Sequence, residues 1–326
     1  MQATDLDFLS GKQVCVVGPN GMVGSAILRI LDGGPATLLR LGREQADLRN
    51  QQAVNTWFAQ NRPTHIFLAA AKVGGIVAND SYPADFLYDN LMIEANVIHA
   101  AYEYGAEKLL FLGSSCIYPK MAPQPLMEDA LLTGPLEPTN QWYAVAKIAG
   151  IKMAEAFRIQ HGCNFISAMP TNLYGPGDNF DLNSSHVVPA LVRKIVDAKN
   201  NNLSAVEIWG TGNPMREFLH VDDCARACVF LMEKYDGLQH VNVGSGYEIR
   251  IADLARLIAK KCGFTGKFVF NTEKPDGTPR KLMNSSCLNS LGWRPEISLD
   301  QGIMQVIDII SSSSSSLRAI DLAASN

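Results

Sequence analysis

Short apolar runs alternate with longer amphipathic segments along the first half of the chain. The apolar runs predict β-strands at residues 12–18, 36–42, 64–71, 107–115 and 164–170. The amphipathic segments predict helices at 22–33, 51–61, 83–104 and around 141–150. Strands that alternate with helices are typical of a parallel sheet covered by helices on both faces. We therefore predict an α/β fold with a Rossmann-like, doubly wound parallel sheet.

The regular alternation ends after Pro170. A loop rich in glycine, proline and asparagine follows, and the later pattern predicts helices at 186–198 and 251–263 and a strand near 240–246. We expect one domain over residues 1–170 and a smaller mixed α/β domain over 171–310, some of whose segments return to the first. The serine-rich segment 311–326 has no sustained core pattern, so we expect it to be disordered.

Composition excludes several classes of protein. The chain has 326 residues, 47% of them hydrophobic, and a formal net charge of -4 without basic blocks, so nucleic acid is not an expected partner. No apolar run reaches the roughly 18 residues of a membrane span, and the acidic N-terminus lacks the apolar core of a secretory signal. Seven scattered cysteines fit a reduced, cytoplasmic protein. Cys224 and Cys228 have no histidine partners at metal-ligand spacing, so we expect no metal site.

A glycine-rich loop follows the first predicted strand. Gly18, Gly21 and Gly24 have GxxGxxG spacing between a strand and a helix, which is typical of a dinucleotide-binding loop. The alternative is an ordinary turn with packing glycines. The second strand ends with Arg40 and Arg43, and no acid precedes Glu44. That pattern favours NADP over NAD, unless the arginines are only solvated surface charges.

Candidate catalytic residues follow the fourth strand and lie on the next helix. Ser114 and Cys116 come directly after the strand, at the edge of a parallel sheet where ligands bind. Tyr143 and Lys147 are four residues apart, so they share one face of the helix. We expect the ammonium to lower the phenol pKa from about 10, which would suit a proton donor to a carbonyl. A tyrosine and a lysine at this spacing also occur together by chance.

The glycine loop, Ser114 and the Tyr143–Lys147 pair, in this order, resemble the extended short-chain dehydrogenase/reductase family. Further segments from about Lys12 to Ile310 are similar to one group within it: GMVGSAI, GSSCIYPK, YAVAKIAG, PTNLYGP, SHVVPAL, MREFLHVDD and KPDGTPRKL. Members of that group epimerise GDP-4-keto-6-deoxy-D-mannose at carbons 3 and 5, and then reduce its ketone with NADPH to give GDP-L-fucose. The resemblance implies that substrate and NADP(H) for this chain.

The resemblance also implies roles for residues. Cys116 would be the base of the epimerisation and His186 its acid, while Tyr143 would donate a proton during reduction, assisted by Lys147 and Ser114. The implied cofactor contacts are Gly18, Asn20, Gly21, Met22, Val23, Gly24, Arg40, Arg43, Ala70, Ala71, Lys72, Leu112, Gly113, Ser114, Ser115, Tyr143, Lys147, Pro170, Thr171, Asn172, Leu173 and His186. The implied substrate contacts are Ser114, Ser115, Cys116, Tyr143, Asn172, His186, Lys194, Trp209, Arg216, Arg280 and Lys281.

Two other functions remain open on the sequence. One is a different sugar-nucleotide epimerase or dehydratase of the same fold that recycles a bound NAD, and the other is a dinucleotide-binding sensor without catalysis. Relatives in the resembled family often form homodimers by packing two helices from each subunit, here those at 83–104 and around Tyr143. The sequence departs from the family in two places: Pro19 and Asn20 replace a basic residue found in some relatives, and the polyserine tail is extra.

Overall fold

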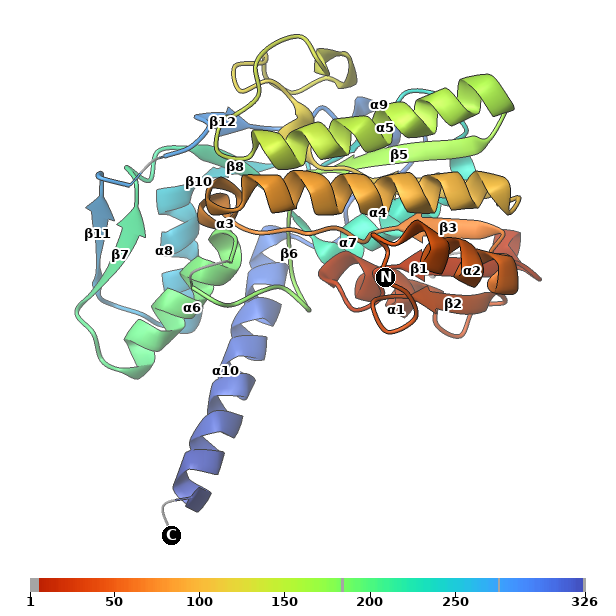
Figure 1. Ribbon diagram of the computed structural model, residues 1–326. Helices are drawn as coiled ribbons and strands as arrows, with labels where there is room; N and C mark the ends of the chain where they lie inside the picture. Colours follow the sequence, from red (N-terminus) through yellow and green to blue (C-terminus); the bar gives the residue numbers. More distant parts are fainter. Residues whose placement is uncertain (1–5, 183–184, 275, 325–326) are drawn as a thin grey trace.

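The computed structural model describes residues 6–182, 185–274 and 276–324. Its largest element is a parallel sheet of six strands in the order β2-β1-β3-β4-β5-β9 (Figure 1). The strands are β1 (Gln13–Val17), β2 (Thr37–Leu41), β3 (His65–Leu68), β4 (Lys108–Leu112), β5 (Asn164–Pro170) and β9 (Val241–Val243). The predicted Rossmann-like, doubly wound α/β fold is confirmed. The central strands are buried along almost their whole length, which explains why they read as continuous apolar runs.

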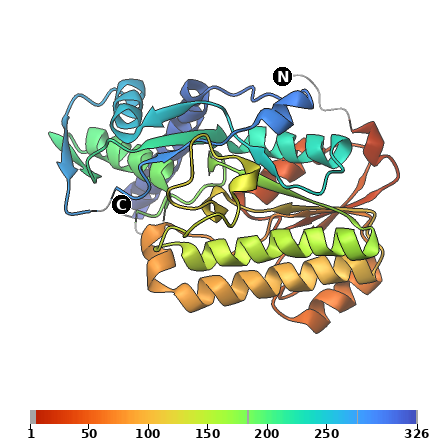
Figure 2. The ribbon, with the colours of Figure 1, turned by 90° about the horizontal axis from the view of Figure 1, so that it is seen from above.

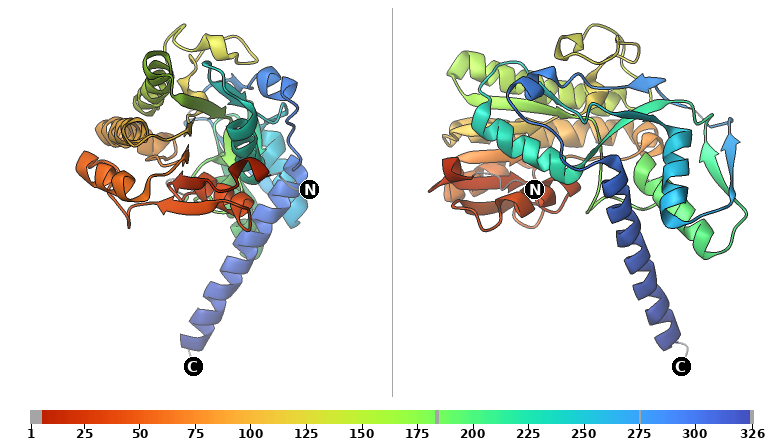
Figure 3. Two further views of the ribbon diagram at one scale, coloured as in Figure 1. Left: turned by 90° about the vertical axis from the view of Figure 1, so that its right-hand side faces the viewer. Right: turned by 180° about the vertical axis from the view of Figure 1, so that it is seen from behind.

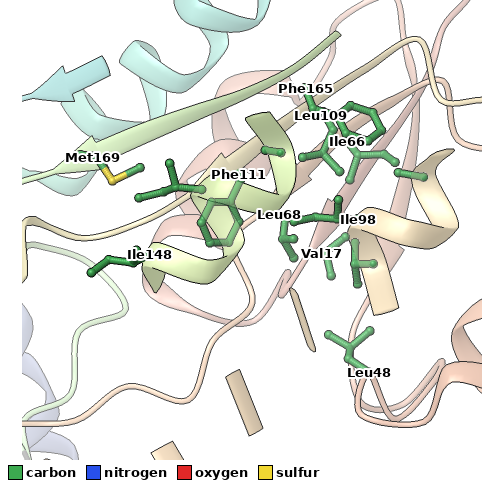
Figure 4. Packing of buried hydrophobic residues seen from close by; sticks show 14 of the residues in the cluster. Val17, Leu48, Ile66, Leu68, Ile98, Leu109, Phe111, Ile148, Phe165 and Met169 are labelled. Atoms are coloured by element: carbon green, nitrogen blue, oxygen red, sulfur yellow. The ribbon is translucent and has the colours of Figure 1, made fainter. Parts of the chain in front are cut away.

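One face of this sheet is covered by three helices. They are α2 (Gln51–Asn61), α4 (Pro83–Glu103) and α5 (Gln141–His161), and α4 and α5 run side by side (Figure 2). Alternate strand residues such as Leu68 and Phe111 form a core with Ile98 of α4 and Ile148 of α5 (Figure 4). Because side chains alternate along a strand, the intervening residues form a second core on the other face.

The opposite face is covered by α1 (Met22–Leu31) and α7 (Val221–Lys234), with the short α9 (Ser286–Ser290) beside them (Figure 3). The chain leaves β1 for β2 and then crosses back past β1 to β3, with α1 and α2 on opposite faces. The order therefore reverses between β1 and β3, and a ligand crevice is expected at the carboxyl ends of these strands.

The remaining segments form a smaller mixed unit. Its strands β6 (Asn172–Tyr174), β10 (Glu248–Arg250) and β12 (Arg280–Lys281) all pair with β8 (Met215–His220), and β7 (Ala205–Trp209) pairs with β11 (Lys267–Asn271). Helices α6 (Val187–Asn200), α8 (Ile251–Cys262) and α10 (Leu299–Ala324) enclose its own apolar core. Two elements that follow Pro170 in the sequence return to the large sheet: β9 pairs with β5, and α7 packs on one face of the sheet.

The elements extend or shorten the predicted segments in several places. The helix around Tyr143 continues to His161, and the strand after Glu107 ends at Leu112, where the short 3-10 turn η2 (Ser115–Ile117) follows. The 3-10 turns η1 (Asp7–Leu9) and η3 (Glu128–Ala130) and the helix α3 (Ile76–Ser81) have no counterpart in the predictions. None of the described helices is both long enough and apolar enough to cross a membrane.

The serine-rich segment differs from its prediction. The sequence pattern predicted disorder over 311–326, whereas α10 continues through the serines to Ala324. The first turns of α10 pack against the core of the smaller unit through Ile303, Val306 and Ile310. Because starting a helix is the costly step, adding the serines to a helix that is already formed costs little. Ser312 Oγ donates to the carbonyl oxygens of Asp308 and Ile309, a local bond that serine can make inside a helix. Residues 325 and 326 lie outside the described part.

Candidate active site

The glycine loop joins β1 to α1 at the crevice edge of the large sheet. Gly18 has a φ of +86°, and a Cβ there would lie 2.8 Å from backbone atoms of Ala70. A Cβ on Gly24 would lie 2.0 Å from the carbonyl oxygen of Gly18. Glycine is therefore needed at both positions. Gly21 is the N-cap of α1, and Met22 and Val23 form its first turn. A helix N-terminus approached by such a loop suits a phosphate.

The carboxyl ends of neighbouring strands complete the crevice. Arg40 and Arg43 are exposed at the end of β2, beyond the glycine loop. Ala70 and Ala71 follow β3, and Ala70 packs against Gly18. A Cβ on Gly113, after β4, would lie 2.3 Å from the sulfur of Met169. The predicted cofactor residues after β1, β3 and β4 are therefore brought to one edge of the sheet.

Two predicted cofactor residues are engaged in other contacts. The ammonium of Lys72 lies 3.0 Å from carboxylate oxygens of both Asp85 and Asp89 on α4, so its charge is already compensated. Asn172, after β5, donates its side-chain amide to the carbonyl oxygen of Glu217 at 2.8 Å. Thr171 beside it is buried. These contacts fix the strand exits but leave the two side chains less available to a ligand.

Lys147 is the most firmly anchored member of the predicted catalytic set. Its side chain is 2% exposed, and Nζ lies 2.9 Å from Oε1 of Glu94 on α4. Nζ also donates to the carbonyl oxygen of Leu112 at 3.0 Å, at the end of β4. The same nitrogen lies 5.8 Å from the ring centre of Tyr143, one helical turn earlier. The ammonium thus joins α5 to the strand end that carries Ser114 and Cys116.

The sequence argument about the Tyr143 phenol is wrong in its direction. Burial raises the pKa of Tyr143 well above its usual value, and the charges of ionised Cys116 and Glu94 raise it further. The ammonium of Lys147, which is paired with Glu94, does not outweigh these effects. The phenol is therefore protonated at neutral pH, which is the form that can donate a proton.

Cys116 lies in the turn after β4 and is 7% exposed. Burial raises the pKa of its thiol. Three groups oppose that increase: the Lys281 ammonium has the largest effect, a hydrogen bond with Ser114 the next, and the charge of Lys147 a smaller one. The backbone N–H of Cys116 donates to Ser114 Oγ at 3.4 Å, which fixes the turn. Ser115 is almost fully buried in the same turn. Lys281, predicted as a substrate contact, therefore also lies close enough to favour the thiolate.

His186 is the N-cap residue of α6 and makes no side-chain capping bond. The His186 imidazole therefore does not cap the helix, which is the ordinary role of a residue at a helix start. The residue is solvent-exposed as a whole, but neighbouring atoms crowd its imidazole: desolvation lowers the pKa of His186, and the charge of Lys281 lowers it further. Since Lys281 acts on both Cys116 and His186, the structure brings a thiol, an imidazole and an ammonium into one neighbourhood.

The predicted substrate cations divide into two kinds. Lys281 of β12 and Arg216 of β8 are register partners on neighbouring strands, so they present two positive charges side by side. Arg280 lines the same pocket as Cys116 and Lys281, but its guanidinium is paired with Glu248 at 2.6 Å. Arg280 is therefore less available than predicted, since its charge is compensated.

An aromatic platform lies farther along the small unit. The ammonium of Lys194 on α6 lies 5.1 Å from the ring centre of Trp209 on β7, and Trp209 is 45% exposed. Lys274 covers the same ring at 5.3 Å. A cation over an exposed ring is a surface on which a nucleobase or sugar can pack.

Sequence reasoning missed one ionisable residue of the site. The sequence pattern places Glu94 within a helix without a role, yet its side chain is 2% exposed and contacts Lys147. A signal was present: Glu94 lies on the same stripe of α4 as the buried residues Phe86, Asn90 and Val97. An acid on the core side of an amphipathic helix indicates a buried ion pair. Within the described residues, no group of three histidine, cysteine or acidic side chains is placed to bind a metal.

Comparison with known proteins places these features in a family. Residues 14–244 match the NAD dependent epimerase/dehydratase family. GDP-L-fucose synthase 1 of Arabidopsis thaliana is 58% identical over 91% of this chain and 92% of its own. GDP-L-fucose synthase of Escherichia coli K12 is 52% identical, covering 90% and 95%. A solved GDP-L-fucose synthetase of Naegleria fowleri bound to NADP is 27% identical, with a TM-score of 0.86 over 94% of this chain and 96% of that one.

Proposed function

Because this chain belongs to the NAD dependent epimerase/dehydratase family, we propose that it converts GDP-4-keto-6-deoxy-D-mannose to GDP-L-fucose. The reaction is 3,5-epimerisation followed by NADPH-dependent reduction at carbon 4. The main support is the 52% and 58% identity to GDP-L-fucose synthases of a bacterium and a plant, over 90% or more of the chain. That identity extends over the small unit as well as the glycine loop, so it covers the segments that would bind the sugar nucleotide.

The cofactor of this reaction is NADP(H). The crowded Gly18–Gly24 turn fits a pyrophosphate, since added side chains would fill the space where backbone must approach phosphate. Arg40 and Arg43, with no acid before Glu44, suit a 2′-phosphate. NADPH supplies the hydride for the reduction. The residues at the ends of β3, β4 and β5 orient it toward Tyr143.

Epimerisation requires a base and an acid on opposite sides of the sugar. A proton on a carbon next to the ketone is acidic enough for the thiolate of Cys116 to remove, which leaves an enolate. Lys281 favours that thiolate because its positive charge opposes the increase in the thiol pKa that burial causes. His186 returns a proton from the other face, which inverts the centre. The same exchange at carbons 3 and 5 gives the L-sugar.

Reduction requires a proton at the ketone oxygen. The Tyr143 phenol is protonated at neutral pH, so it can give its proton to the oxygen as the hydride arrives at carbon 4. Lys147, anchored to the Leu112 carbonyl, stabilises the phenolate that remains. Ser114 lies at the same strand end and hydrogen-bonds the sugar. Arg216 and Lys281 bind the diphosphate, and Trp209 with Lys194 packs on the nucleotide.

The proposed function is tested by incubating the purified chain with GDP-4-keto-6-deoxy-D-mannose and NADPH. We expect one NADPH to be oxidised per sugar, and NMR to give the stereochemistry of GDP-L-fucose. Epimerised sugar without net NADPH oxidation would indicate an epimerase that recycles its cofactor. NADPH binding without any turnover of the keto-sugar would indicate a sensor. Either of these results would refute the proposal.

Gly24→Ala is expected to weaken NADPH binding. The added Cβ would meet the Gly18 carbonyl oxygen at 2.0 Å, and the loop must move away from the helix. Overpacking of this kind costs about 1–3 kcal/mol, which corresponds to roughly 5-fold to 150-fold in Kd. Fluorescence titration with NADPH measures the change.

The control is Gly263→Ala at the end of α8, where the new methyl group meets no atom within 4 Å but the φ of +76° is strained. It is expected to lower the melting temperature and to leave the NADPH affinity unchanged. Equal NADPH affinity in Gly24→Ala and the wild type would contradict the assignment of this loop.

The protein is proposed to be a homodimer in the cytoplasm. All seven cysteines are free, as in a reducing compartment. Apolar side chains are exposed on the outer faces of α4 and α5: Tyr88 is 60%, Trp142 42%, Val145 43% and Ile159 73% exposed. Packing these helices against the same pair of a second copy would bury them in a four-helix bundle.

Light scattering coupled to gel filtration is expected to give twice the chain mass of 35.5 kDa. Ile159→Glu should shift the protein toward the monomer, because it places a charge in the proposed interface. Leu203→Glu, at an apolar position outside these helices that is 54% exposed, should leave the mass unchanged. A wild-type mass of one chain would contradict the dimer.

A further inference from the structure

A buried carboxylate lies behind the catalytic lysine. Glu94 and Lys147 come from neighbouring helices, each side chain is 2% exposed, and 2.9 Å separates Oε1 from Nζ. Within the described part of the chain, the two oxygens of Glu94 have no polar partner other than this ammonium. An acid is rarely buried unless it is paired, so the pair is a specific feature of the interior next to the candidate site.

The helix that carries Lys147 leaves room for this carboxylate. Gly150 lies on α5 less than one turn after Lys147, and a Cβ there would lie 2.8 Å from Oε2 of Glu94 and 2.4 Å from the ring of Phe111. Glycine inside a helix lowers its stability, so its presence indicates a packing requirement. Here the requirement is the close approach of Glu94 and Phe111 to α5.

The ammonium has three neighbours that fix its place. Glu94 lies on one side, the carbonyl oxygen of Leu112 accepts its hydrogen bond, and the ring face of Phe111 lies 4.6 Å from Nζ. Of these, only Glu94 carries a formal charge. The other ionisable groups of the neighbourhood are Tyr143 on the same helix, Cys116 after β4, and Lys281, which acts on Cys116.

We propose that Glu94 is a positioning residue for the reduction step, holding the Lys147 ammonium against the Leu112 carbonyl and balancing its charge so that Tyr143 stays protonated until it reacts. The inference rests on the function proposed above and adds a residue to it. Glu94 does not contact the sugar or the cofactor in this account. It acts through Lys147, and through the field it exerts on the phenol.

The charges give a definite sign for the effect of removing this carboxylate. Burial raises the pKa of Glu94, and the Lys147 ammonium opposes that increase. The charge of Glu94 in turn raises the pKa of Tyr143, after the larger effects of burial and of Cys116. Without that negative charge, the phenol of Tyr143 releases its proton more easily. The loss of activity that follows deprotonation of the phenol must therefore occur at lower pH.

The decisive variant is Glu94→Gln, with Glu103→Gln as control. Glu103 is an exposed acid of the same helix, and among the described residues its ionic neighbour is His99 at 3.9 Å. The pH profile of kcat is measured from NADPH oxidation with GDP-4-keto-6-deoxy-D-mannose. Activity requires the protonated phenol, so activity is present below the pKa of Tyr143 and lost above it. We expect Glu94→Gln to move this alkaline limb down by about one pH unit and to lower kcat by roughly 10-fold to 100-fold.

Glu103→Gln should give the wild-type profile. Glu94→Asp should move the alkaline limb down by less than Glu94→Gln, because the shorter acid keeps the charge but holds it farther from Lys147 and Tyr143. A Glu94→Gln enzyme with an unmoved limb would overturn the inference, even if kcat were lower, since that would be a purely structural effect. Should Glu94→Gln not fold, Glu94→Asp decides: a limb moved to lower pH would support the inference, and an unmoved limb would overturn it. Absence of turnover by the wild type would instead refute the proposed function.

Discussion

Tyr143→Phe is expected to stop NADPH oxidation while hydrogen exchange at carbons 3 and 5 of the keto-sugar continues. The substitution removes one hydroxyl and keeps the ring that packs near the Lys147 ammonium. No group then donates a proton to the ketone oxygen when hydride is added to carbon 4. The product would be an unprotonated alkoxide in a partly buried site. General acids of this kind contribute about 10²-fold to 10⁴-fold, so kcat should fall by that factor.

Two measurements on the same reaction distinguish the reduction step from the epimerisation step. Absorbance of NADPH at its nicotinamide band follows reduction, and NMR in D₂O follows deuterium incorporation at carbons 3 and 5. Tyr104→Phe is the matched control, because Tyr104 lies at the far end of α4 beside Arg62. Reduction that persists in Tyr143→Phe at a rate close to that of Tyr104→Phe would remove the phenol from the mechanism.

Cys116→Ser is expected to stall epimerisation. The replacement keeps the size and the turn, whose fixed contact is the backbone N–H of Cys116 to Ser114 Oγ. A serine hydroxyl is a far weaker acid than a thiol, so it provides almost no anion to remove the proton next to the ketone. Deuterium exchange at carbons 3 and 5 should fall by about 10²-fold to 10⁴-fold.

The exchange rate of the wild type should also depend on pH. Burial raises the pKa of the Cys116 thiol, and Lys281 only partly opposes this. Because the base is active when deprotonated, exchange should increase as pH rises through the neutral and mildly alkaline range. Cys163→Ser, a half-buried thiol outside the candidate site, is the control and should keep the wild-type rate. Undiminished exchange in Cys116→Ser would show that another group is the base.

Features formed by residues that are close together in the chain could be predicted from local sequence patterns. The GxxGxxG loop and the Tyr143–Lys147 spacing depend on residues close together in the chain, and their elements follow from apolar periodicity. The structure adds what a single loop cannot reveal. Gly24 needs to be glycine because of Gly18, and Gly18 because of Ala70, which lies on another strand exit.

Contacts between distant segments account for what sequence reasoning missed or misjudged. Glu94 and Lys147 meet only because α4 and α5 pack together. The Tyr143 pKa is raised, against the expected direction, first by burial, then by the charge of Cys116 and last by the charge of Glu94. Lys281 reaches Cys116 because β12 pairs with β8. Arg280 and Lys72 are ligand contacts that the family resemblance implies, while the structure pairs both with acids. Pairing of this kind cannot be predicted without knowing which segments are neighbours.

A crystal structure with NADP and GDP-4-keto-6-deoxy-D-mannose bound tests the central claim most directly. We predict that Oη of Tyr143 lies within hydrogen-bond distance, about 2.6–3.2 Å, of the ketone oxygen at carbon 4, on the side opposite the nicotinamide ring. Lys147 should remain on the Leu112 carbonyl. A Tyr143 phenol directed away from the sugar, with a different acid at that oxygen, would contradict the account.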